Sequence, residues 1–166
     1  MAIHFFSTQQ NIPADLSEVW QYFSDPSNLK RITPSALGFE VISEAQPRPD
    51  IYAGQVIEYR VSPLLGIPLY WMTEITHVKS EQYFVDEQRQ GPYSLWHHQH
   101  HFKKIAGGVE MTDMVHYKIP GWFLGDMVNS LLVKAQLQKI FHFRHRQVEA
   151  AFGAWPGAQL KSLQIR

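Results

Sequence analysis

The sequence of 166 residues contains no cysteine. Disulfide bonds, thiolate zinc sites, iron–sulfur clusters and a cysteine nucleophile are therefore all excluded. A Gly-x-Ser-x-Gly nucleophile turn and a glycine-rich phosphate loop are also missing from the chain. Any metal site must therefore be built from histidine and carboxylate side chains.

An excess of charge and a long apolar run are lacking as well. Lys and Arg number 15 and so do Asp and Glu, so the chain has no positive excess of the kind that general nucleic-acid binding requires. No stretch approaches the ~18 apolar residues that span a bilayer, and the first residues lack the apolar core of a signal peptide. We therefore expect a soluble, cytoplasmic protein that binds no nucleic acid and does not insert stably into a membrane.

The residues that are present, 45% hydrophobic and 13% aromatic, suffice for one domain with a sizeable core. After an initial strand over residues 2–10, two short helices are predicted, the first with Asp15 as N-cap and the second ending before Thr33-Pro34. A long helix is predicted between Gly121 and Gly153, because no proline interrupts that stretch. Alternating apolar residues predict further strands over residues 37–45, 55–61, 69–78, 82–88, 94–105 and 109–119.

These elements predict an α+β fold. Strands joined by short turns form an antiparallel meander, and the long helix is the one large apolar cover for its inner face. We expect a curved antiparallel sheet of six to seven strands wrapped around the C-terminal helix, with a ligand cavity between them. Residues 1–153 form a single domain in this interpretation, and residues 154–166 form a peripheral or partly disordered tail.

Several short segments carry a resemblance to a known family: Ile32-Thr33-Pro34, Ile57-Glu58-Tyr59, Trp71 with Ile75, residues 84–88, 91–93, 96–102 and 111–117, and Pro120. In this order, over about residues 3–152, they resemble the helix-grip fold of the START-like (SRPBCC) superfamily. That group includes polyketide cyclases, lipid-transfer domains and birch-pollen-allergen-like proteins. The sequence is most similar to bacterial ligand-binding members described as cell-division-inhibitor-like. The resemblance implies an internal ligand site without metal, but not one activity, because the superfamily holds enzymes and carriers.

Five of the nine histidines fall within one short stretch of the chain. Strand alternation places His98 and His100 on one face with Trp96, and His97 and His101 on the other face. The first face mixes aromatic and polar groups, so we expect it to line the cavity. His97 and His101 are expected to face outward.

The next strand brings two more polar side chains to that face. A tight turn at residues 107–108 places His98 opposite about Tyr117 and His100 opposite about Val115. Asp113, on the same face as Tyr117, then lies near Phe102 or His100. Asp113 and Tyr117 are therefore predicted to face the cavity together with the two histidines.

Three interpretations of His98, His100 and Asp113 stay open. They can be polar core residues that satisfy one another, or they can orient the polar group of a ligand in an apolar pocket. In the third, two histidines and one aspartate form a site for iron or zinc. A His–Asp pair is also suited to general acid–base catalysis, because histidine titrates near neutral pH.

Four further residues are candidates for the cavity wall, namely Tyr59, Trp71, Asp86 and Gln88. Each lies in phase with apolar neighbours on a predicted strand, and each offers a hydrogen-bonding group. The alternative is ordinary strand alternation, in which Asp86 is paired to a neighbouring histidine, since an unpaired buried carboxylate is costly.

The sequence therefore predicts a binding protein that encloses a small hydrophobic or amphipathic molecule, without cofactor or bound metal. The second hypothesis is an enzyme of the polyketide cyclase, aromatase or dehydratase kind that uses His98 or His100 with Asp113. The third is a protein that binds a metal through histidine and carboxylate.

Overall fold

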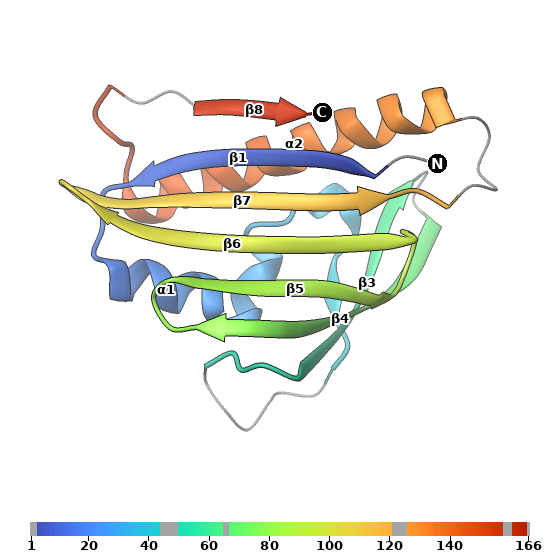
Figure 1. Ribbon diagram of the computed structural model, residues 1–166, viewed down its shortest axis with the longest axis horizontal. Coiled ribbons are helices and arrows are strands. Elements are labelled where there is room, and N and C mark those ends of the chain that lie inside the picture. Colours follow the sequence, from blue (N-terminus) through green and yellow to red (C-terminus); the bar gives the residue numbers. More distant parts are fainter. Residues whose placement is uncertain (1–2, 44–49, 65–66, 121–125, 158–160, 166) are drawn as a thin grey trace.

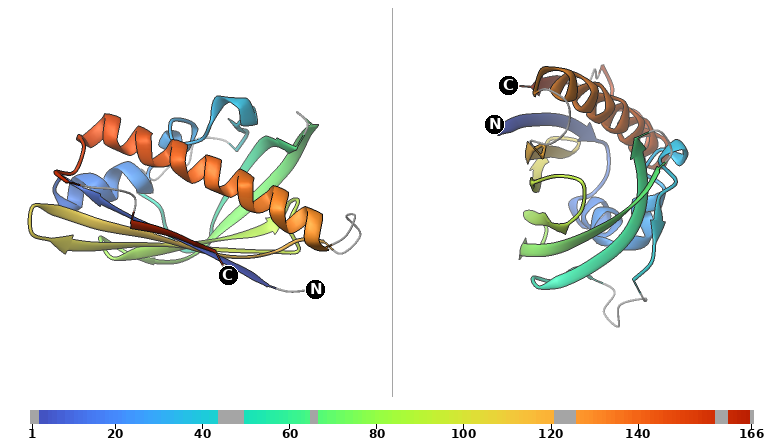
Figure 2. Two further views of the ribbon diagram at one scale, coloured as in Figure 1. Left: turned by 90° about the horizontal axis from the view of Figure 1, so that it is seen from above. Right: turned by 90° about the vertical axis from the view of Figure 1, so that its right-hand side faces the viewer.

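The computed structural model describes residues 3–43, 50–64, 67–120, 126–157 and 161–165. Its strands form one antiparallel sheet that curls around a long helix (Figures 1 and 2). The elements in chain order are β1 (His4–Ile12), α1 (Leu16–Ser24), the 3₁₀ helices η1 (Pro26–Lys30) and η2 (Ser35–Leu37), β2 (Glu40–Val41), β3 (Gln55–Leu64), β4 (Ile67–Lys79), β5 (Tyr83–Gln90), β6 (Leu95–Ile105), β7 (Gly108–Lys118), α2 (Asp126–Phe152) and β8 (Lys161–Ile165).

The sheet order is β2-β3-β4-β5-β6-β7-β1-β8, so the meander from β2 to β7 is extended by the first strand of the chain. Helix α2 lies along the concave face, and the short helices lie beside it (Figure 2). This arrangement confirms the predicted helix-grip fold, with a curved sheet, short helices after the first strand and one long C-terminal helix, although three short helices are present where two were predicted. In the described part of the chain, no helix is long and apolar enough to cross a membrane.

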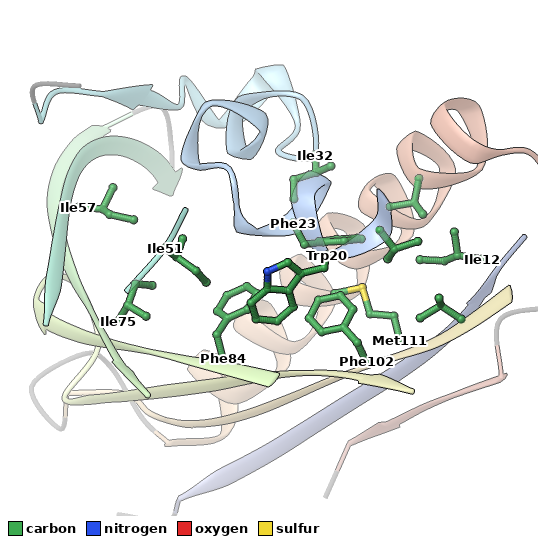
Figure 3. Packing of buried hydrophobic residues seen from close by; sticks show 13 residues of the cluster. Ile12, Trp20, Phe23, Ile32, Ile51, Ile57, Ile75, Phe84, Phe102 and Met111 are labelled. Carbon is green, nitrogen blue, oxygen red and sulfur yellow. The ribbon is translucent and has the colours of Figure 1, made fainter. Parts of the chain in front are cut away.

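Strand alternation creates the core. In β7 every second residue from Val109 to Tyr117 is buried, and in β6 the buried residues are His98, His100 and Phe102. The ring of Trp20, on α1, packs edge-on against Phe102 at 5.4 Å between ring centroids (Figure 3). Burial of each large apolar side chain contributes about 1.5–3 kcal/mol.

The turn between β6 and β7 differs from the prediction by one residue. Ile105 lies opposite Gly108, so the turn consists of Ala106 and Gly107. Gly107 has a left-handed φ of +84° that suits the second position of a tight turn. Gly108 belongs instead to the strand, where a Cβ atom would lie 2.0 Å from the Ile12 carbonyl oxygen of β1.

This shift changes the cross-strand partners. His98 lies opposite Val115 rather than Tyr117, and His100 lies opposite Asp113. The predicted pairing was therefore wrong, because each residue of β6 lies opposite a residue two positions earlier in β7 than predicted. The predicted face was nevertheless correct, because a shift of two residues leaves the strand alternation unchanged.

The C-terminal tail also differs from the prediction. Residues 161–165, expected to be peripheral or partly disordered, form the edge strand β8, which pairs with β1. Before it, the ring of Trp155 lies beside the β6–β7 turn, 3.3 Å from the position of a Cβ atom built on Gly107. The tail thus adds an eighth strand to the sheet, and the division of the chain at residue 153 stays a prediction.

The short helices differ from the prediction in detail. Asp15 precedes α1 in an extended conformation, but its side chain makes no capping hydrogen bond. Asp25 does cap η1, because its Oδ1 accepts a hydrogen bond of 2.9 Å from the backbone N–H of Ser27. The second predicted helix is thus a 3₁₀ helix held by an aspartate–proline start.

Candidate functional site

A cavity of about 180 Å³ lies between the concave face of the sheet, helix α2 and the short helices. Most of its wall is apolar. Phe23, Leu29 and Ile32 contribute from the short helices, and Ile57 and Ile75 contribute from β3 and β4. A cavity of this composition suits a small apolar or amphipathic molecule.

Polar groups enter this wall from β5 and β6. Asp86, His98 and His100 line the cavity, as does Trp96 at the start of β6. His98 is 6% exposed and His100 is 3% exposed, so both imidazoles are almost fully removed from solvent. The predicted face of this strand therefore does line the cavity.

The opposite face carries the remaining histidines of β6. His97 Nδ1 lies 2.8 Å from Glu87 Oε1, and its Nε2 lies 2.9 Å from the side chain of Gln99. His101 Nε2 contacts the other end of the Gln99 amide at 2.9 Å. His97 and His101 thus belong to a hydrogen-bonded row on the outer face, as expected, and neither lines the cavity.

Two histidines and two aspartates form a compact network at the cavity wall. Asp86 Oδ2 lies 3.3 Å from His98 Nδ1 and 2.8 Å from His100 Nε2. Asp113 Oδ1 lies 2.9 Å from His98 Nε2 and 2.9 Å from His100 Nδ1, although the last pair lacks hydrogen-bond alignment. Each imidazole therefore has one aspartate at each of its two nitrogens.

Helix α2 adds a cation to this network. Arg144 Nη1 donates a hydrogen bond of 3.2 Å to Asp113 Oδ1, and the guanidinium carbon lies 5.5 Å from the ring centroid of Phe141 and 5.9 Å from that of Phe23. The side chain of Arg144 is only 13% exposed. Arg144 thus neutralises Asp113 from the helix side and stacks on aromatic rings.

Burial and charge act in opposite directions on these groups. Burial alone would lower the pKa of His98, but the carboxylates of Asp86 and Asp113 outweigh it and raise the pKa of His98 above its usual value. Burial would raise the pKa of Asp113, but Arg144 and the two histidines hold it well below its usual range. The pKa of Asp86 is also lowered, because His98 and His100 outweigh its burial. Both aspartates are therefore ionised.

Tyr59, on β3, and Trp71, on β4, also line the cavity. The Tyr59 hydroxyl lies 2.8 Å from Thr73 Oγ1, and burial, assisted by the negative charge of Asp86, raises the pKa of Tyr59. The indole Nε1–H of Trp71 is buried and has no hydrogen-bond partner in the described part of the chain. A ligand oxygen could satisfy that donor.

Three predicted residues do not line the cavity. Gln88 accepts a hydrogen bond from the Tyr93 backbone N–H and donates one to the Tyr93 carbonyl, so it closes the β5–β6 connection. Tyr117 packs in an apolar cluster with Leu137 and Phe141, near the middle of α2. Asp113 lies behind His98 and His100 and reaches the cavity through them.

Arg144 is a site residue that the sequence analysis did not identify. The signal was its spacing, because Leu137, Phe141 and Val148 lie on the same face of that helix and are all buried. A cation on a buried helix face needs an acidic partner, which here is Asp113.

The comparisons with known proteins agree with this architecture. Residues 12–142 match the family described as polyketide cyclase/dehydrase and lipid transport. Among curated proteins, no relative matches the sequence.

Solved structures share the fold at low sequence identity. Protein Ms6760 from Mycobacterium smegmatis has a TM-score of 0.63 at 16% identity, over 89% of each chain. Ginseng major latex-like protein 151 from Panax ginseng has a TM-score of 0.65 at 15% identity, over 91% of this chain and 99% of its own. The protein Ara h 8.0201 has a TM-score of 0.58 at 16% identity, over 90% of this chain and 99% of its own. These similarities show the fold alone, and the narrower likeness to cell-division-inhibitor-like proteins stays a prediction.

Proposed function

The chain belongs to the polyketide cyclase/dehydrase and lipid transport family, and from this premise we propose that it binds one small amphipathic molecule in the cavity between sheet and α2. The cavity carries the proposal, because its wall is apolar except for a few polar groups. The apolar part of the ligand would contact the isoleucines and phenylalanines of the wall. Its polar part would face Asp86, His98 and His100, or accept a hydrogen bond from Trp71. The cytoplasmic location stays a prediction of the sequence.

The expected result is a stoichiometric small molecule in the purified protein. Native mass spectrometry of protein prepared without detergent should show a mass above that of the bare chain, and extraction into organic solvent should release the compound. Protein freed of that compound should bind the neutral apolar probe N-phenyl-1-naphthylamine. A protein that retains no molecule and does not bind the probe would contradict the proposal.

A second candidate function is supported by the two histidines at the cavity wall. Each is held between two ionised aspartates, an arrangement that can hold and deliver a proton to a bound substrate. This supports a cyclase, aromatase or dehydratase reaction on a substrate with ketone groups. His98 and His100, paired with Asp113 and Asp86, would act as the acid and base.

The test of this second function measures turnover and ligand binding separately. With a β-keto thioester as test substrate, His98→Ala and His100→Ala should each lower turnover by at least 10²-fold, the usual contribution of general acid–base catalysis. Affinity for N-phenyl-1-naphthylamine should change little, because the apolar wall is intact. Turnover that survives both substitutions would rule out this mechanism.

A further inference from the structure

We propose that Asp86, His98 and His100 form a binding site for one divalent transition-metal ion, with zinc as the representative ion. One ligand atom of each residue lies within 4.8 Å of the other two. The closest approach is through Asp86 Oδ2, which lies 3.3 Å from His98 Nδ1 and 2.8 Å from His100 Nε2. Atoms bound to zinc at about 2.0–2.2 Å in a tetrahedron lie roughly 3.3 Å apart, so small side-chain shifts suffice.

The residue types fit such an ion. Imidazole nitrogen and carboxylate oxygen are the donors that zinc and ferrous iron accept, and the chain offers no thiolate that would compete. Three protein donors leave at least one coordination position open. Because all three residues line the cavity, the open position faces the space available to a small molecule.

Asp113 orients the imidazole of His98 from behind through a hydrogen bond, and it also lies against His100. Its Oδ1 lies 2.9 Å from His98 Nε2 and 2.9 Å from His100 Nδ1, the nitrogens that do not face Asp86. A carboxylate behind a metal-bound histidine fixes the ring and its tautomer. The structure therefore replaces Asp113, the third ligand in the sequence hypothesis, with Asp86.

The charges distinguish the two aspartates. Arg144 contacts Asp113 at 3.2 Å, whereas no Lys or Arg contacts Asp86 in the described part of the chain. An imidazole that binds a metal is neutral, so the ion would replace a proton held by the histidines. Asp86, Asp113 and Arg144 then sum to one negative charge in a buried place, and the ion beside Asp86 compensates it. This inference does not depend on which organic molecule the cavity binds.

The test uses the full chain without an affinity tag, treated with chelator and then titrated with Co²⁺ and Zn²⁺. We expect one equivalent of Co²⁺ with visible d–d absorption, displaced by Zn²⁺, and a rise in melting temperature on Zn²⁺ addition. Asp86→Asn should abolish the absorption band. Asp113→Asn should weaken Zn²⁺ binding by about 10–100-fold, as expected for an orienting carboxylate.

The matched control is the double variant His97→Ala and His101→Ala, which removes two histidines from the other face of the same strand and should leave binding unchanged. X-ray absorption of the zinc-loaded wild-type chain needs no variant and should show two imidazole ligands. Failure to bind one equivalent, binding that persists in Asp86→Asn, loss of binding in the control, or fewer than two imidazoles would each overturn the proposal. None of these readouts reports on binding of an apolar probe, so they are independent of the proposed ligand function.

Discussion

At the scale of single residues, Asp113 connects the sheet to helix α2 through its contact with Arg144. It is 5% exposed, and its Oδ1 contacts His98, His100 and Arg144. Arg144 in turn fills the space between two aromatic rings, so its side chain contributes both a charge and packing. A buried carboxylate that loses such a partner keeps the desolvation penalty without the compensating attraction.

We predict that Arg144→Met lowers the free energy of unfolding by about 3 kcal/mol, because it leaves Asp113 charged and buried without its cation. The matched control is Arg146→Met, an exposed arginine two residues further along α2, which should change stability by less than about 0.5 kcal/mol. Urea unfolding of chelator-treated protein measures the free energy of unfolding of both variants.

The double variant Asp113→Asn with Arg144→Met completes a thermodynamic cycle. Because the two side chains interact, its loss of stability should be smaller than the sum of the single losses. Additive losses would show that Arg144 acts through packing on Phe23 and Phe141 and not through Asp113.

At the scale of secondary-structure elements, the β6–β7 hairpin determines which side chains meet in the site. Its turn at Ala106 and Gly107 sets the register, and the register places His100 opposite Asp113. Gly108 makes this hairpin compatible with β1, because the Ile12 carbonyl oxygen approaches it so closely that a side chain has no space. The positions of one turn and one glycine therefore determine which carboxylate meets which imidazole.

Gly108→Ala is predicted to lower the free energy of unfolding by about 3 kcal/mol or more, because the new methyl group meets backbone atoms that cannot move aside. The control is Gly54→Ala. Gly54 has a φ of +91° and open space around it, so the substitution should cost about 1–2 kcal/mol from the backbone conformation alone. Thermal and urea unfolding measure both variants. If Gly108→Ala and Gly54→Ala lost the same stability, the close approach of Ile12 to Gly108 could not be the cause.

At the scale of the whole molecule, the sheet, α2 and the short helices together form a cavity that no single element forms alone. The sheet supplies the polar groups of β5 and β6, and the short helices and α2 cover them. The volume of the cavity limits what can bind, so a larger side chain on its wall should exclude a ligand.

Ile57→Trp should reduce the affinity for N-phenyl-1-naphthylamine by at least 10-fold, because Ile57 lines the cavity and the larger ring occupies the binding space. Val56 is its neighbour on β3, 40% exposed and absent from the cavity wall. Val56→Trp should therefore leave the affinity unchanged. Circular dichroism verifies that both variants fold, and equal affinities in a folded Ile57→Trp variant would show that the probe binds elsewhere.

The sequence alone predicted much of this architecture, because its signals are local. The alternation over β6 and β7 placed His98, His100 and Asp113 on the inner face, and Gly153 marked the end of α2. A resemblance carried by short segments in a fixed order predicted the family that residues 12–142 then matched. Such patterns follow from the geometry of strands and helices and need no knowledge of distant contacts.

Only the tertiary structure decided which of these residues meet. It placed Asp86 from β5 and Asp113 from β7 on either side of the two imidazoles, brought Arg144 from the helix, and added β8 to the sheet edge. It also separated Gln88 and Tyr117 from the cavity. The physical reason is that pairing between elements depends on register, turn length and long-range packing, which differ by a residue or two without changing the local pattern. The sequence therefore determined which histidines face inward, and the fold determined which charges surround them.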